Sequence, residues 1–156
     1  NRPESICGDL VPMNDIIKYD LSKLEGEHFL QTHTTNPLLK SKTIDSAIVK
    51  YFDNLGKYDS TFSVTKLQTR LFDKNINPIN HKFGELIRTQ DLDPIFEENS
   101  NFYIFSKESF LTANNNRIGI KPLMFEVNKL ESQDIDDEED FIIAETMYQR
   151  EFNYGS

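Results

Sequence analysis

Segments with the spacing of helices alternate along this chain with segments of strand-forming residues. In residues 13–26, MNDIIKYDLSKLEG, apolar side chains recur near helical spacing, Asn14 is a suitable N-cap and Gly26 lies beyond the end. A short apolar strand is expected over 27–32, followed by a second helix over 42–54. This succession of strand, loop and helix predicts an α/β fold.

Three more segments are expected to be strands because they are rich in β-branched and aromatic residues and are bounded by turn residues: 60–67, 101–106 and 122–127. Between the first two, Pro78, Gly84 and Pro94 interrupt a weakly periodic stretch, which indicates an excursion from the sheet over 67–97. A chain of 156 residues is long enough for one core and short for two, so we expect a single domain over 1–156.

The charge balance limits the ligands and partners. The chain has 26 acidic and 17 basic residues, a net charge of −9, which disfavours binding to nucleic acid. Any anionic ligand must therefore meet a local Lys, Arg or metal ion. No apolar run approaches the roughly 20 residues of a membrane span. The lone Cys7 allows no internal disulfide, and no signal peptide is recognisable, so a cytoplasmic location is expected.

The stretch SQDIDDEEDFIIAE, residues 132–145, allows three interpretations. In the first, Asp136 caps a final helix and Glu139 completes a capping box. In the second, the carboxylates form a calcium loop, but that loop needs Gly at its sixth position, where this chain has Glu139. In the third, Asp134 and Asp136 end an extended segment, point to the same side and hold one hard cation, while 137–140 only start the helix. Spacing alone leaves the choice between them open.

Five stretches in the same order resemble the acylneuraminate cytidylyltransferase family, the enzymes that make CMP-sialic acids and related CMP-activated sugar acids: RPESICGD, FLQTHTTNPLLKSKTIDSAI, YDSTFSVTKLQTRLF, FEENSNFYIFSKESFL and SQDIDDEEDFIIAE. The resemblance implies a Rossmann-like nucleotide-diphospho-sugar transferase fold, with a mixed sheet covered by helices on both faces, and a homodimer. It also implies that a 2-keto sugar acid of the nonulosonic type attacks the α-phosphate of CTP and releases pyrophosphate.

The same resemblance implies roles for individual residues. Asp134 and Asp136 match the family's DID motif and would be the catalytic Mg²⁺ ligands, since Mg²⁺ prefers carboxylate, phosphate and water oxygens. The residues that match substrate-binding positions are Arg2, Gln31, Arg88 and Asn99, with Arg70 and Lys66 as helpers. Glu97 stands where the sialic acid enzymes have an Arg, so the resemblance leaves the sugar acid open.

One family feature is missing from these residues. The family's Gly-, Ser- and Lys-containing phosphate loop has no counterpart here, and the six glycines are scattered. The sequence is therefore expected to correspond to the C-terminal two-thirds of such an enzyme, truncated at the N-terminus. The excursion over 67–97 is expected to mediate dimerisation and to lend residues to the neighbouring active site. Two alternatives stay open: a noncatalytic dimerising sugar-acid-binding domain, and a cytidylyltransferase for 3-deoxy-octulosonate.

Overall fold

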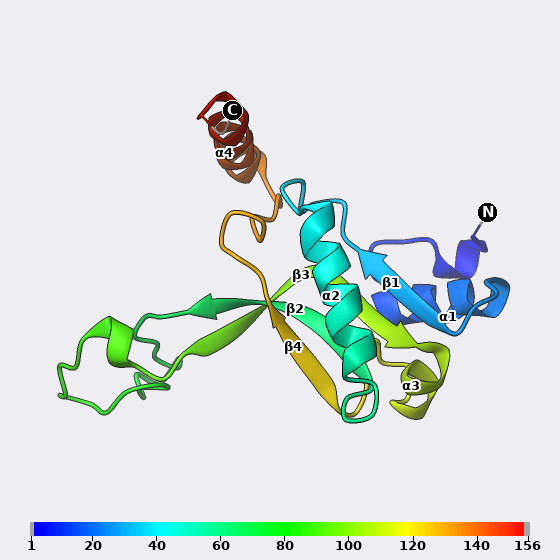
Figure 1. The fold of residues 1–156 in the computed structure, drawn as a ribbon, viewed down its shortest axis with the longest axis horizontal. Helices are drawn as coiled ribbons and strands as arrows, with labels where there is room; N and C mark the ends of the chain where they lie inside the picture. Colours follow the sequence, from blue (N-terminus) through cyan, green and yellow to red (C-terminus); the bar gives the residue numbers. More distant parts are fainter. Residues whose placement is uncertain (1, 155–156) are drawn as a thin grey trace. The chain divides into compact units, whose positions relative to one another are not determined.

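The computed structural model describes residues 2–154, which form helices and a four-stranded sheet (Figure 1). The helices are α1 (Met13–Lys23), α2 (Ser41–Asp53), α3 (Lys107–Thr112) and α4 (Glu138–Tyr154), with single 3-10 turns at Glu4–Ile6 and Thr89–Asp91. The strands are β1 (His28–Thr32), β2 (Ser60–Leu67), β3 (Ile95–Ser106) and β4 (Pro122–Glu126). The predicted α/β class is confirmed.

The described residues cluster into two compact units. Unit 1 contains those of Asn1–His33, Lys40–Phe62 and Ser100–Phe125, and unit 2 contains those of Thr34–Leu39, Ser63–Asn99 and Glu126–Ser156. No helix within residues 2–154 combines the length and the apolar character that crossing a membrane requires.

The sheet is mixed, as expected. Its strands lie in the order β1-β3-β2-β4, and β1 pairs antiparallel with β3. β2 and β4 run parallel, because the backbone bonds that join 59 to 121 and 64 to 127 advance in the same direction along both strands. In the register of β1 and β3, Phe29 lies opposite Phe105 and Gln31 lies opposite Tyr103.

Helices α1 and α3 cover one face of the sheet in unit 1. Alternate residues of a strand point to opposite faces, so Tyr103 and Phe105 share this face with Phe29 and Gln31. The core cluster here consists of Ile17, Leu21, Tyr103, Phe105 and Phe110. Burying each of the two Phe side chains stabilises the fold by about 2 kcal/mol.

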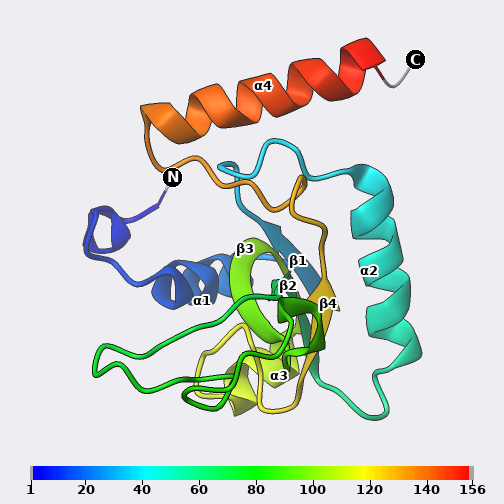
Figure 2. The same cartoon turned by 90° about the vertical axis from the view of Figure 1, so that its left-hand side faces the viewer.

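Helix α2 covers the other face, as Figure 2 shows. Its buried residues are Ala47 and Tyr51, and the Tyr51 hydroxyl lies 2.9 Å from Nδ1 of His28 on β1. Burial, with a smaller effect from the Asp59 carboxylate, raises the pKa of Tyr51 to about 12. The phenol therefore stays neutral near pH 7 and holds α2 to the edge of the sheet. The expected coverage of both faces is confirmed.

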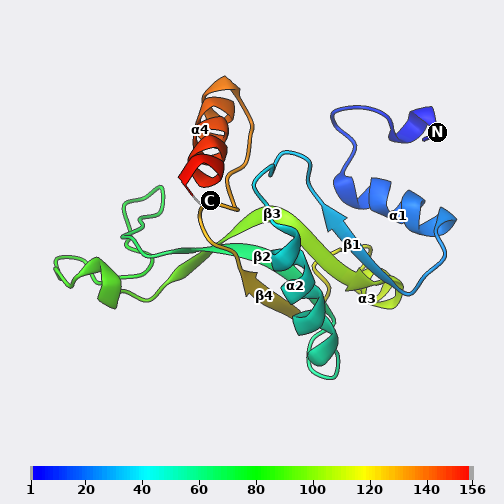
Figure 3. The same ribbon diagram turned by 45° about the horizontal axis from the view of Figure 1, so that its top comes forward.

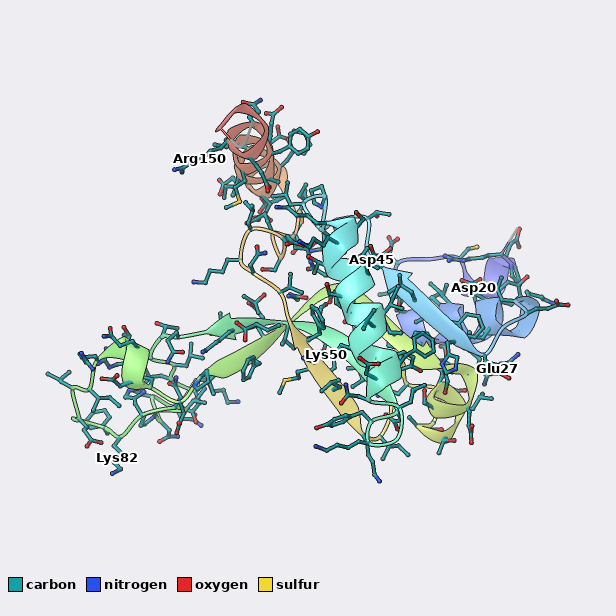
Figure 4. All side chains as sticks on the ribbon, in the orientation of Figure 1. Asp20, Glu27, Asp45, Lys50, Lys82 and Arg150 are labelled. Carbon is teal, nitrogen blue, oxygen red and sulfur yellow. The ribbon has the colours of Figure 1, made fainter. Side chains whose placement is uncertain are left out.

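Residues 68–94 of unit 2 connect β2 to β3, and Lys82 lies on these loops (Figure 4). Residues 95–97, which the sequence assigns to the excursion, belong to β3. Within these loops, Phe72 and Pro78 form an isolated antiparallel β-bridge. Leu92 is buried, whereas six apolar side chains of this region lie exposed: Phe72, Ile76, Ile79, Phe83, Leu86 and Ile87. The exposed fraction reaches 77% for Phe83 and 91% for Leu86.

Three local features differ from the sequence predictions. Helix α1 begins at Met13 with Pro12 as its N-cap residue, so Asn14 is inside the helix and does not cap it. Strand β3 begins at Ile95, not at 101. The sequence does not indicate its first half because that half is an acidic stretch with low strand propensity. The sequence patterns do not predict helix α3. A reciprocal capping box between Ser106 and Ser109 forms its N-terminal end.

Candidate functional site

Asp137, and not Asp136, is the N-cap of α4. Its Oδ1 accepts hydrogen bonds from the backbone N–H groups of Glu139 at 2.9 Å and Asp140 at 3.0 Å. The Asp140 carboxylate in turn accepts from the backbone N–H of Asp136 at 3.2 Å. The capping box predicted for Asp136 and Glu139 is therefore wrong, and the capping role lies one residue further along the chain.

The calcium-loop interpretation is excluded by the helix itself. Glu138 begins α4, so the second half of the supposed loop, including Glu139 at its sixth position, is helical. A helix cannot make the sharp turn that this position requires. The acidic run from 137 to 140 instead complements the positive end of the helix dipole.

Asp134 and Asp136 lie in the coil that leads into α4 (Figure 3). Oδ1 of Asp134 accepts only from the N–H of its own neighbour Ile135, at 3.1 Å, and the Asp136 side chain is exposed. Neither carboxylate pairs with a Lys or Arg within residues 2–154. The two side chains therefore have carboxylate oxygens that can bind a ligand. If either residue capped α4, its oxygens would instead accept hydrogen bonds from the helix N–H groups.

Two carboxylates can supply part of the coordination of a hard divalent cation that keeps most of its coordination for water or phosphate oxygens. Mg²⁺ behaves in this way, whereas a closed protein site needs more ligands. Within residues 2–154, His, Cys, Asp and Glu side chains nowhere form a group of three or more that could hold a metal ion. Carboxylate oxygens are ligands of the type that Mg²⁺ prefers, and two of them would leave its remaining positions to water or to a ligand.

Gln31 lies near the C-terminal end of β1 in unit 1, and Arg117 holds its side chain. Nη1 of Arg117 donates to Oε1 of Gln31 at 2.9 Å and lies 3.4 Å from Nε2 of His33. The guanidinium carbon stands 3.6 Å above the centre of the Tyr103 ring, the residue that pairs with Gln31 across the strands. The Gln31 amide is thus fixed by a cation that is itself stacked on the sheet.

The other predicted binding residues in unit 2 lie along β2, β3 and the loops between them. Asn99 is buried and donates from Nδ2 to Oγ1 of Thr65 at 3.0 Å, which joins β3 to β2. Lys66 is exposed on β2. Arg70 donates to the backbone carbonyl of Ile87, which brings it beside the segment that carries Arg88.

Two of the predicted binding residues are paired with carboxylates. Arg88 makes a two-pronged ion pair with Asp91, with nitrogen–oxygen distances of 2.7 and 3.1 Å. Arg2, in unit 1, reaches Asp20 at 3.4 Å. Both pairs are exposed, so each contributes at most about 1 kcal/mol and can be exchanged for a ligand.

The sequence patterns do not predict a binding role for Arg117. A signal for it does exist: no acidic residue occurs between Glu108 and Glu126, and Arg117 lies at the middle of that stretch in a strongly acidic chain. An unpaired cation in such a window is a candidate for an anionic ligand.

The fold is similar to that of a solved structure. No family model matches the sequence, and no curated protein matches it at a significant level. The crystal structure of 4-diphosphocytidyl-2C-methyl-D-erythritol synthase from Anaerococcus prevotii is similar over 86% of this chain, with a TM-score of 0.52 and 15% sequence identity. The chain spans 65% of the length of that synthase. At this identity the likeness concerns the fold, and it agrees with the Rossmann-like fold expected from the sequence.

The capping assignment predicts different stabilities for two neighbouring substitutions. Asp137→Ala removes the acceptor of two helix N–H groups and should lower the free energy of unfolding by about 1 kcal/mol. Asp136→Ala removes an exposed side chain without a partner and should change it by less than about 0.5 kcal/mol. Urea unfolding followed by circular dichroism measures both. A larger loss for Asp136→Ala than for Asp137→Ala would return the cap to Asp136.

Proposed function

We propose that this chain belongs to a cytidylyltransferase that joins CMP from CTP to a keto sugar acid. The observation that carries the proposal is the separation of roles at the start of α4: Asp137 caps the helix, which leaves Asp134 and Asp136 to bind a ligand. Two carboxylates with open oxygens suit a nucleotide site that works through a divalent cation. The shared fold with a solved synthase whose name contains diphosphocytidyl supports the nucleotide class.

In the proposed reaction the anomeric oxygen of the sugar acid forms a bond to the α-phosphorus of CTP. The bond from that phosphorus to the pyrophosphate oxygen breaks, and the hydroxyl proton passes to water. Asp134 and Asp136 would hold Mg²⁺, which when bound neutralises charge on the phosphate oxygens. Gln31, fixed through its Oε1, offers its amide group to the sugar acid or nucleotide.

The sugar-acid class follows from the resemblance, and Glu97 leaves the identity of the sugar acid open. This residue is exposed and acidic, where the sialic acid enzymes have an Arg, and a carboxylate disfavours an anionic group beside it. A nonulosonic acid such as N-acetylneuraminate and the shorter 3-deoxy-octulosonate are therefore both substrates to be tested. Arg2, Arg88, Arg70, Lys66 and Asn99 are the further binding residues of this proposal.

We also propose that the protein is a twofold homodimer through its 67–97 excursion. The exposed apolar side chains of this region are too numerous for a loop in water, and burying them against a second copy would stabilise the assembly. The exposed ion pair of Arg88 with Asp91 lies on the same loops. A second copy would thus place Arg88 where it can reach the neighbouring site.

A pair of isosteric substitutions tests the metal role of the two aspartates. Asp136→Asn should reduce turnover at least ~100-fold, because a contact that neutralises charge in the transition state is lost. Asp137→Asn is the matched control, since Asn caps a helix as well as Asp does and turnover should stay within about twofold. The measurement is release of pyrophosphate from CTP by the full-length native protein, with Mg²⁺ and a panel of keto sugar acids.

Small and equal effects of the two substitutions would remove the metal role from Asp136. Binding of a sugar acid without pyrophosphate release from any member of the panel would replace the transferase by the noncatalytic sugar-acid-binding alternative. Binding of Mn²⁺ to the 156-residue chain, followed by electron paramagnetic resonance, gives a second readout that does not depend on turnover. It should weaken with Asp136→Asn and not with Asp137→Asn.

The dimer is tested by placing a charge among the exposed apolar side chains of the excursion. Phe83→Asp should shift the protein from dimer to monomer at micromolar concentration in sedimentation velocity, because a buried unpaired carboxylate opposes association. Leu10→Asp is the control: Leu10 is 96% exposed in unit 1, outside the excursion, and its substitution should leave the dimer intact. A wild-type protein that sediments only as a monomer would contradict the dimer.

A further inference from the structure

Arg117 is a half-buried cation with no carboxylate partner within residues 2–154. We propose that it forms, together with Gln31, a subsite for an anionic oxygen group of the ligand. The shared chemistry is that of a carboxylate or a phosphate, which the sugar acid or the nucleotide could supply. The inference rests on the proposed function only for the identity of that ligand, and the subsite itself stands on the contacts of unit 1.

The guanidinium is oriented by three neighbours from the sheet. It stacks on the Tyr103 ring at 3.6 Å, donates from Nη1 to Gln31 at 2.9 Å and lies 3.4 Å from Nε2 of His33. Tyr103 is fully buried and its hydroxyl meets Oγ of Ser100 at 3.2 Å, so the stacking platform cannot move away. A stacked and hydrogen-bonded Arg has lost most of its rotamer freedom before a ligand arrives, which favours binding.

Only one nitrogen of the guanidinium is used by these contacts. Nε and Nη2 of Arg117 have no acceptor among residues 2–154, and they lie in the plane of the fork that binds a carboxylate or phosphate through two parallel bonds. Stacking on the ring covers one face of the guanidinium and leaves its edge available. The donors that remain are therefore those that recognise an anion.

The charge environment of Arg117 differs from that of Arg2 and Arg88. Arg2 and Arg88 each face a carboxylate, at 3.4 and 2.7 Å. Arg117 has no acidic residue within eight positions on either side, since Glu108 and Glu126 are the nearest. Partial burial without a counter-charge costs free energy, and an incoming anion recovers it.

Labelling with phenylglyoxal, an Arg-specific reagent, followed by peptide mass spectrometry, tests the subsite in the unmodified protein. The probes are N-acetylneuraminate, its methyl ester and CMP, each at about 10 mM, above the ~1 mM dissociation constant expected for a weak single-anion contact. We expect at least fivefold slower labelling of Arg117 with N-acetylneuraminate but not with the ester if the sugar supplies the anion. If the nucleotide supplies it, CMP protects Arg117 and the acid does not.

Arg150, which projects from α4 in Figure 4, is the internal control and should react at the same rate with every probe. An unchanged Arg117 rate with all three probes overturns the proposal. So does equal protection by the acid and its ester without protection by CMP, because the charge would then play no part. If Arg117 is protected but the full-length native protein releases no pyrophosphate with any sugar acid of the panel, the transferase function is refuted and the subsite still stands.

Substitutions provide a second measurement, by calorimetric titration with the probe that protects. Arg117→Gln should weaken its binding by roughly tenfold to a hundredfold, the effect of losing a charge-assisted pair of hydrogen bonds. Arg117→Lys should recover part of this loss because it keeps the charge without the fork. Lys50→Gln is the matched control: Lys50 stacks on Phe125 at 5.2 Å in the same unit, and its substitution should leave affinity unchanged. Equal affinity of the wild-type and Arg117→Gln proteins, with both folded by circular dichroism, contradicts the subsite.

Discussion

The burial of the second half of β3 is the constraint on which unit 1 depends. All five residues from Asn101 to Phe105 are buried, and β3 lies between β1 and β2 in the sheet. A strand buried on both faces needs helices on both faces, which α2 supplies on one side and α1 and α3 on the other. Because side chains alternate along paired strands, this packing also fixes the register of β1. A slip of one residue would turn Gln31 away from Tyr103 and into the face that α2 covers.

Electrostatics decides what the positioned side chains can bind. The chain carries −9, so an anionic ligand must meet positive charge at particular points and not across the whole surface. Unit 1 provides Arg117, stacked on the buried ring of Tyr103 and free of carboxylates. Unit 2 provides Asp134 and Asp136, which we propose to bind a divalent cation instead of the anion itself. In the proposed enzyme the protein thus meets the charge of CTP and of a sugar acid by two different means.

The sequence predicted the fold class, the helices α1 and α2, the strands β1, β2 and β4 and the second half of β3, because these depend on local periodicity and turn residues. It missed the first half of β3, because Glu97 and Glu98 have low strand propensity. This half forms a strand in a sheet in which β3 lies next to β2. It misplaced the cap of α4 by one residue, since Asp136 and Asp137 are chemically identical and only backbone geometry chooses between them. The bond from Arg117 to Gln31 joins residues 86 positions apart, and no local pattern reveals such a contact.

The central claim is that Asp134 and Asp136 together hold the divalent cation of a cytidylyl-transfer site. Crystals grown with Mn²⁺ and CMP, measured by anomalous diffraction at the manganese edge, test it directly. The account predicts one anomalous peak in contact with carboxylate oxygens of both residues, at about the 2.1 Å of a small octahedral cation, with a CMP phosphate oxygen completing the coordination. A CMP-bound structure with no peak at these two residues, or with manganese held elsewhere, would contradict it.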